Sequence, residues 1–192
     1  MTLKVATRTH NNKMRLTNVV YQANLNVKID LSCLVHQLHN VRYNPRIFPG
    51  LIYQNRKIGG NCLIFSNGKI NCNGARSDFD SGVKRLRRYA RIVQRLGYIV
   101  RLSEVRLVTA SAVHKLSGRI NVKSLSRIPD FQYNPELFPA AMLRRQGIHF
   151  TCHLGGSVLI TGIKHSTDLD NVVFPTMVEI ERACSLITSI QI

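Results

Sequence analysis

The sequence predicts an α+β protein in which two similar halves share one antiparallel sheet, with helices on one face. The main observation is a near-repeat, YNPRIFPG at 43–50 and YNPELFPA at 133–140, spaced by 90 positions. Around each copy the chain follows the same predicted order of strand, helix, strands and helix. Two amphipathic helices per half can cover only one face of a shared sheet, and an antiparallel sheet tolerates an open second face. We therefore expect two pseudo-symmetric repeats, at 14–100 and 101–192, after a basic leader at 1–13.

The first half opens with a long strand that starts near Met14. Its alternation divides the side chains between two sides: Val19, Tyr21 and Ala23 on one, and Asn18, Val20 and Gln22 on the other. Asp30 then caps a short helix, LSCLVHQLHN, and prolines at 45 and 49 break the chain. LIYQ, NCLIFS and KINCNGA are predicted as three short strands, and a helix from about Asp78 to Leu96 ends at Gly97.

The second half repeats this order. The stretch 98–116 is strand-like, and INVKSLSRI at 120–128 is the predicted short helix. AMLRR, IHFTCHL and SVLITGI are predicted strands. A final helix covers about 170–187, with a kink expected near Pro175.

The charge of the chain indicates a polyanionic partner. Lys and Arg number 27 against 10 acids, a formal net charge of +17 over 192 residues. So many positive charges repel one another unless a partner of opposite charge binds them. Nucleic acid is the first expected partner, and an acidic protein or a membrane surface is the second choice. The basic residues run from Lys4 to Arg182, which favours a charged folded surface over a disordered arm.

Catalytic and metal chemistry find little support in the sequence. The five cysteines form no CxxC pair, and there is no GxSxG elbow or phosphate-binding glycine loop. His149, Cys152 and His153 lie close together, but no second ligand pair accompanies them, so an ordinary strand is favoured over a metal site. No signal peptide or membrane span is visible, and we expect a soluble intracellular protein without enzymatic activity, cofactor or metal.

Several long motifs carry a family resemblance. YNPRIFPGLIY, LIFSNGK, NGAR and the basic YARIVQRLG, with YNPELFP and LITGIK in the second half, closely resemble the TATA-box-binding protein family. The resemblance spans about 14–190. It implies a saddle: one curved ten-stranded antiparallel sheet with helices on the convex face and DNA under the concave face. By this resemblance the protein binds and bends double-stranded, AT-rich DNA through the minor groove.

The resemblance also implies which side chains unstack bases. Phe48, which we expect in a loop tip before Pro49, would form the first wedge pair with Phe65, and Phe138 matches the first wedge of the second half. His153 stands at the fourth wedge position, where the family has Phe. The alternative for each Phe is an ordinary core residue.

Further positions match the DNA-facing set of the family. The base-facing residues would be Asn18, Val20, Leu63, Asn73, Leu159 and Thr161, with Thr109 at the place of a second central Asn. The phosphate contacts would be Lys69, Arg76, Arg144 and Lys164. The alternative for each cation is a solvated surface charge.

The sequence departs from the family pattern at more positions in the second half than in the first. In the second half, Ser111 stands where the family has a valine of the apolar DNA-facing surface, and Ser157 stands where it has the lysine of a turn. In the first half, Gln54 and Asn71 depart from the family pattern. These changes predict a weaker or altered DNA preference. They resemble the TATA-binding-protein-like factors or a divergent homologue, a viral one included.

The helix at 78–96 predicts a second surface. Its basic residues are Lys84, Arg85, Arg87, Arg88, Arg91 and Arg95. In the family this helix contacts acidic regulators, and the protein-partner residues would be Lys84, Arg85, Arg88 and Arg91. Glu136 and Leu137 match positions that contact transcription factor IIB, although Asn134 replaces a glutamate beside them.

Two functional hypotheses follow. The first is a TATA-binding-protein-like initiation factor that recruits factors IIA and IIB and the RNA polymerase machinery. It would act in the nucleus, or at the site of viral transcription if the source is a virus. The second is a degenerate protein-interaction module of the same fold with weak or lost DNA binding. RNA binding by the open sheet is less favoured, because the RNP aromatic motif is absent.

Overall fold

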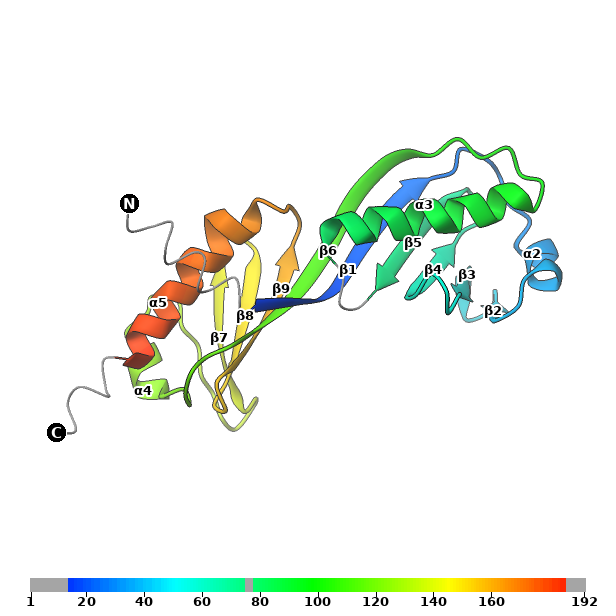
Figure 1. Cartoon of the computed structure of the whole chain (residues 1–192). Coiled ribbons are helices and arrows are strands. Elements are labelled where there is room, and N and C mark those ends of the chain that lie inside the picture. The colour runs from blue at the N-terminus through cyan, green and yellow to red at the C-terminus, as the bar shows by residue number, and fades with distance from the viewer. Residues whose placement is uncertain (1–13, 75–77, 186–192) are drawn as a thin grey trace. The chain divides into compact units, whose positions relative to one another are not determined.

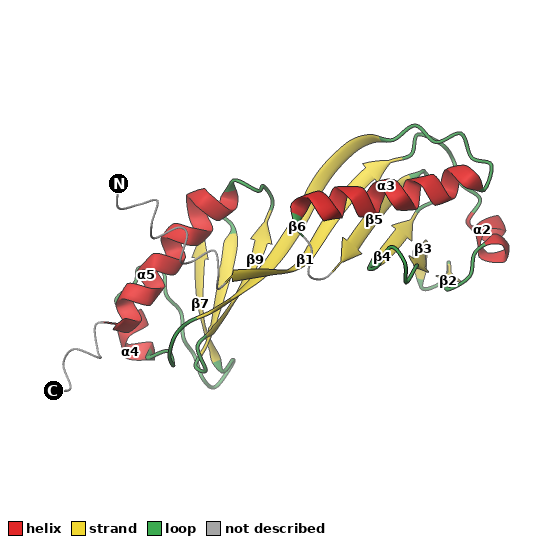
Figure 2. Ribbon diagram, viewed as in Figure 1, coloured by secondary structure: helices red, strands yellow, loops and turns green. Residues whose placement is uncertain are grey.

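The computed structural model describes residues 14–74 and 78–185, without the side chain of Ser185. The predicted leader at 1–13 and Arg76 lie outside these residues. The described strands form one antiparallel sheet in the order β2-β3-β4-β5-β1-β6-β9-β8-β7 (Figure 2). The predicted α+β class and the single antiparallel sheet are confirmed.

The described residues contain nine strands, so the expected ten-stranded sheet is wrong by one. The missing strand is the second-half counterpart of β2 (Val41–Asn44). Its place is taken by an isolated bridge in which Gln132 and Met142 each donate a backbone N–H to the other's carbonyl at 2.8 Å. This single bridged pair is not followed by further paired residues, so it does not form a strand.

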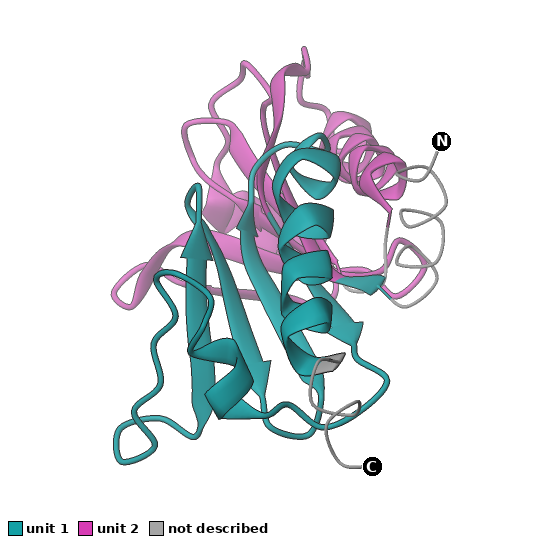
Figure 3. Cartoon of the chain, turned by 90° about the vertical axis from the view of Figure 1, so that its left-hand side faces the viewer, with its two compact units in different colours: residues 1–16, 110–192 teal, residues 17–109 magenta. Residues whose placement is uncertain are grey.

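The chain divides into two compact units, residues 17–109 and residues 1–16 with 110–192 (Figure 3). The repeat boundaries at 14–100 and 101–192 stay a prediction. We call the first the N-terminal unit and the second the C-terminal unit, and describe each by itself.

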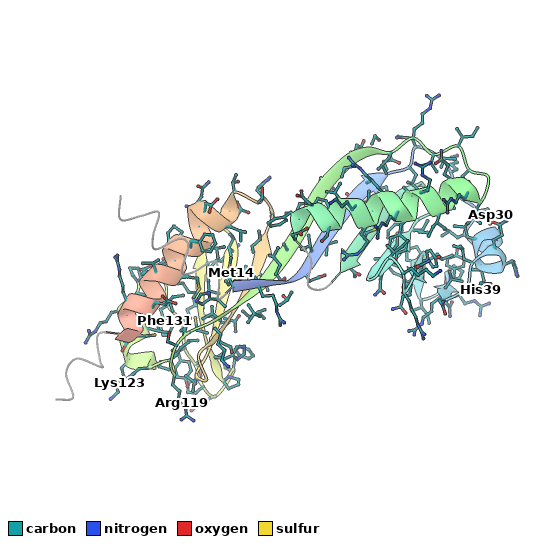
Figure 4. The ribbon with its side chains drawn as sticks, viewed as in Figure 1. Met14, Asp30, His39, Arg119, Lys123 and Phe131 are labelled. Atoms are coloured by element: carbon teal, nitrogen blue, oxygen red, sulfur yellow. The ribbon has the colours of Figure 1, made fainter. Side chains whose placement is uncertain are left out.

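The N-terminal unit is built on five strands and two helices. They are β1 (Met14–Asn24, mostly in this unit), α2 (Leu31–Gln37), β2, β3 (Phe48–Gln54), β4 (Asn61–Ile64), β5 (Lys69–Gly74) and α3 (Phe79–Arg95). Residues 103–109 of β6 (Ser103–Lys115) also belong to this unit. The three strands predicted after the proline-rich motif are present, whereas β2 was missed. Asp30 caps α2 as predicted, accepting from the backbone N–H of Cys33 at 3.1 Å (Figure 4).

Helix α3 lies along one face of the N-terminal unit's strands (Figure 1). Its buried stripe contains Leu86, Tyr89, Ala90 and Val93. Gly82 lets the helix approach β1 closely, because a Cβ there would lie 2.6 Å from the Tyr21 ring. The packing therefore fixes which face of the sheet is covered and which stays open.

Tyr89 ties α3 to the turn between β3 and β4. Its ring meets Tyr53 edge-on at 5.5 Å, and its hydroxyl donates to the carbonyls of Gly59 and Gly60 at 3.3 and 3.2 Å. Burial raises the pKa of Tyr89 to about 12, so the hydroxyl stays a donor at physiological pH.

The C-terminal unit repeats the plan with less regular edges. It begins with residues 110–115 of β6 (Ser103–Lys115). The elements that follow are α4 (Val122–Leu125), β7 (Ala140–Arg145), β8 (Ile148–His153), β9 (Ser157–Ile163), a π-helical turn (Leu169–Val173) and α5 (Phe174–Ser185). Helix α5 covers one face of β7, β8 and β9 (Figure 1). On that face the buried His114 lies 3.1 Å from Glu181 of α5. A π-helical turn directly precedes α5, and the kink expected near Pro175 stays a prediction.

Candidate nucleic-acid interface

The face of the N-terminal unit opposite α3 carries the predicted base-facing side chains. On β1, Val19, Tyr21 and Ala23 are buried under the helix, while Asn18, Val20 and Gln22 are half-buried on the other side, as the alternation predicted. The same alternation continues on β4 and β5. The half-buried residues on the open side are Asn61 and Leu63 of β4 and Asn71 and Asn73 of β5.

Two phenyl rings pack together on this open side. The centroids of Phe48 and Phe65 are 5.8 Å apart, with the ring planes at 67°. Gly50 lies beneath them, and a Cβ there would come within 2.7 Å of Phe48 and 2.9 Å of Phe65. Both rings stay half-buried rather than entering the core under α3. An aromatic pair with an exposed edge is suited to stacking against a planar partner.

Phe48 does not lie in the loop tip that the sequence predicted. It is the first residue of β3, and the tip is the turn before it, where Ile47 is 82% exposed. The prediction was wrong because pairing of Phe48 with Asn44 extends the β2–β3 ladder up to the turn.

The polar side chains of this face are bonded to one another. Gln22 donates from Nε2 to Asn71 Oδ1 at 2.9 Å, and Arg106 of β6 donates to Gln22 Oε1 from Nε at 3.0 Å and from Nη2 at 2.6 Å. Asn73 Oδ1 accepts from the backbone N–H of Asn61 at 3.0 Å. The sequence placed Gln22 on this side of β1, but it did not predict the contact between Gln22 and Arg106, because the two residues lie 84 positions apart.

The remaining predicted residues of the N-terminal unit lie on or beside the sheet. Thr109 is half-buried on β6, and Lys69 is exposed at the start of β5.

The open face of the C-terminal unit is more polar. Leu159 and Thr161 of β9 are half-buried, and next to them β8 presents His149, Thr151 and His153. His153 is exposed and pairs in register with Ala140. This face therefore offers an imidazole where the N-terminal unit offers a phenyl ring.

Phe138 and the predicted phosphate-contacting cations of this unit lie at its surface. Phe138 is 40% exposed and follows the turn that carries Glu136 and Leu137, where Leu137 is 83% exposed. Arg144 and Lys164 are exposed. Arg144 also lines, with His149, a hollow of about 290 Å³.

Most of the basic side chains of α3 gather over a second surface. Lys84, Arg88 and Arg91 are exposed as predicted. Arg87, Arg88, Arg91 and Arg95 line a hollow of about 650 Å³ together with Lys57 from the β3–β4 turn. Arg85 differs from the others, because it is half-buried with its guanidinium against Gly74.

The residues considered for metal binding do not converge. Cys152 is buried on the helix-covered side of β8, whereas His149 and His153 are exposed on the other side. Burial raises the pKa of Cys152 to about 12, which keeps it a thiol. Within residues 14–74 and 78–185, no group of three His, Cys, Asp or Glu side chains could hold a metal ion. In the same residues no helix is long and apolar enough to cross a membrane.

Comparison with known proteins places this geometry in a family. The family model described as transcription factor TFIID (or TATA-binding protein, TBP) matches residues 13–96. TATA-box-binding protein 1 of Arabidopsis thaliana is 34% identical over 153 residues, which cover 78% of this chain and 76% of that protein. TATA box-binding protein-like 2 of Rattus norvegicus is 34% identical over 159 residues, which cover 81% of this chain and 46% of that protein.

The chain thus spans less than half the length of the rat relative, and 50% of the TATA-box-binding protein of Spodoptera frugiperda. The solved structure of Methanococcus jannaschii TBP has the same fold, with a TM-score of 0.72 at 24% identity over 90% of this chain and 98% of that one. From the extent and identity of these matches, the chain belongs to the TATA-box-binding protein family.

Proposed function

We propose that this protein is a transcription initiation factor that binds double-stranded DNA through the minor groove and bends it. The observation that carries the proposal is the Phe48–Phe65 pair, which lies half-buried on the open face rather than under α3. Minor-groove architectural proteins insert such apolar wedges between base steps. An aromatic pair kept out of the core can pack against a planar apolar surface, and a base stack is one.

The other residues on the open face of each unit suit the same ligand. Val20, Leu63 and Leu159 would form apolar floor, while Asn18, Thr109 and Thr161 supply polar groups for the acceptors that A·T pairs present in the minor groove. Lys69, Arg144 and Lys164, with Arg76, would contact phosphates, which raises affinity and salt sensitivity without reading sequence. The net charge of +17 acts in the same direction.

Phe138→Ala tests the proposal in the C-terminal unit. We expect it to weaken binding to an AT-rich duplex about tenfold, because a partly exposed phenyl ring can no longer bury itself against bases. A mobility-shift titration across salt concentrations, with AT-rich and GC-rich duplexes, measures this. Ile99→Ala is the matched control, because Ile99 is 79% exposed but lies beyond α3 rather than on the open face. Equal affinities of the two variants would contradict the proposed wedge.

The second candidate is a protein-interaction module of the same fold with weak or lost DNA binding. The polar C-terminal face favours it, since His149, Thr151 and His153 give an unstacked base little apolar surface. DNA affinity that is indifferent to both Phe48→Ala and Phe138→Ala would support this candidate over the first.

Under either function the protein would act in the nucleus with the basal transcription machinery. By the family resemblance, Glu136 and Leu137 would contact factor IIB, and Leu137 is 83% exposed and so accessible to a partner. The exposed cations of α3 would contact factor IIA or another acidic regulator. Like charges on neighbouring helical turns destabilise an isolated helix, and an acidic partner removes that repulsion.

Charge reversal on α3 separates partner binding from DNA binding. Arg88→Glu with Arg91→Glu is expected to weaken binding of factor IIA about tenfold or more, because two attractive charges become repulsive. Affinity for duplex DNA should change much less, since α3 lies on the covered face of the unit. Titration calorimetry with each ligand measures both. Lys123→Glu with Arg127→Glu carries the same change of charge on exposed residues at α4, and equal loss with this pair would show only a net-charge effect.

A further inference from the structure

A chain of side-chain hydrogen bonds crosses three strands on the open face of the N-terminal unit. Arg106 of β6 donates to Gln22 Oε1 of β1 at 3.0 and 2.6 Å, and Gln22 Nε2 donates to Asn71 Oδ1 of β5 at 2.9 Å. Gln22 and Asn71 are register partners, so the bond spans a directly paired position of the sheet. We call these three residues the amide relay.

The direction of the amide relay follows from the chemistry of its first member. A guanidinium has five donors and no acceptor, so the Gln22 atom that faces Arg106 must be the oxygen. The Gln22 nitrogen then points at Asn71, and the Asn71 atom that receives it must also be an oxygen. Flipping either amide would set donor against donor. The NH₂ group of Asn71 is therefore left on the side away from Gln22.

The side-chain amide of Asn73 is oriented in the same way, but by a different donor. The backbone N–H of Asn61 donates to Asn73 Oδ1 at 3.0 Å, and a backbone N–H also cannot accept. Its NH₂ group is thus the free end. Among the residues that the structure describes, neither Asn71 Nδ2 nor Asn73 Nδ2 donates to a protein acceptor.

The two NH₂ groups belong to neighbouring positions of one face. Asn71 and Asn73 are two residues apart on β5, a separation of about 6.6–6.8 Å along a strand. Both side chains are half-buried on the side opposite α3.

We propose that the amide relay makes Asn71 a specificity-determining residue that selects A·T over G·C pairs. Since its oxygen is turned toward Gln22 and that of Asn73 toward the Asn61 N–H, the amide groups of Asn71 and Asn73 present their NH₂ donors to the ligand. Adenine N3 and thymine O2 accept from them, whereas the guanine amino group is a donor and finds no acceptor. Arg106 and Gln22 are positioning residues that act through Asn71. The inference rests on the proposed minor-groove binding and deepens it.

Gln22→Glu tests the direction of the amide relay. The carboxylate still accepts from Arg106, but it has no donor for Asn71. Asn71 must then rotate, giving its NH₂ to Glu and turning its oxygen to the open face, where a guanine amino group can be accepted. We expect the ratio of affinities for A·T and G·C duplexes to fall about five- to tenfold, the effect of one discriminating contact. Inosine·cytosine duplexes, which lack the amino group, should bind the wild type like A·T and show no gain with Gln22→Glu.

Gln54→Glu is the matched control for the added charge. Gln54 is exposed on β3 of the same unit and takes no part in the amide relay. It should lower affinity for all three duplexes equally and leave the ratio unchanged. Arg106→Met should also lower the ratio, because it frees the Gln22 amide to flip. Thermal melts of each variant confirm that the fold persists.

The possible outcomes distinguish a failure of the amide relay from a failure of the proposed minor-groove binding. A wild-type protein that binds duplexes, with the same A·T to G·C ratio in Gln22→Glu, would overturn the amide relay alone. A wild-type protein that binds none of the three duplexes would overturn the proposed function, and the inference with it.

Discussion

Gly60→Ala is expected to destabilise the N-terminal unit by about 3–5 kcal/mol, the upper range for single substitutions. Gly60 has a φ of +64° and directly precedes β4. A Cβ there would overlap the backbone oxygen of Asn73, so β4 and β5 would have to separate at their first register pair. Separation would also break the bond from Asn61 N–H to Asn73 Oδ1 and the one from Tyr89 to the Gly60 carbonyl. Urea denaturation followed by circular dichroism measures the loss.

The neighbouring glycine is the control. Gly59 also has a positive φ, +79°, but a Cβ there would meet nothing within 4 Å. Gly59→Ala should cost only the left-handed backbone strain of an L-residue, about 1–2 kcal/mol. Equal losses of stability for the two variants would show that the close approach to Asn73 does not matter.

The sequence could predict which face of the sheet each side chain of a single strand lies on, because buried and exposed side chains alternate along the strand. The faces of β1 follow directly from side chains that alternate on a pleated strand, and the structure has Val19 buried and Val20 half-buried as predicted. The tenth strand and β2 were misjudged for a common reason. Proline-rich edge segments pair through a few backbone groups, and a short edge ladder leaves no hydrophobic pattern to read.

The candidate site was predictable where a family motif carried it and not where distant side chains meet. Phe48 and Phe65 could be named from the sequence, but the role of Gly50 beneath their rings requires coordinates. Lys57 joins the arginines of α3 only because the β3–β4 turn folds back beside the helix. In the sequence, Asn71 is only a departure from the family pattern. Its bond to Gln22 gives the same residue an orientation, which no local pattern records.

The two units are expected to bend DNA unequally, and the difference lies in one pair of positions. In the N-terminal unit Gly50 leaves room for two phenyl rings, whereas its counterpart 90 positions later is Ala140, which faces His153 in register. An imidazole is smaller and more polar than a phenyl ring, so it gains less from contact with an unstacked base. Phe48→Ala should therefore reduce bending strongly, and His153→Ala should change it little.

Rebuilding the second wedge should reverse this asymmetry. His153→Phe alone lacks the space that Gly50 provides in the other unit, so it should raise duplex affinity only slightly. Ala140→Gly together with His153→Phe makes that space and is expected to raise affinity about tenfold, the effect of about 1.4 kcal/mol of added apolar contact. Energy transfer between dyes on the ends of a short AT-rich duplex would report the larger bend, with Ala140→Gly alone as the control for backbone effects. If His153→Ala abolishes bending as fully as Phe48→Ala, the imidazole is already a working wedge, because its loss then costs as much as the loss of a phenyl ring.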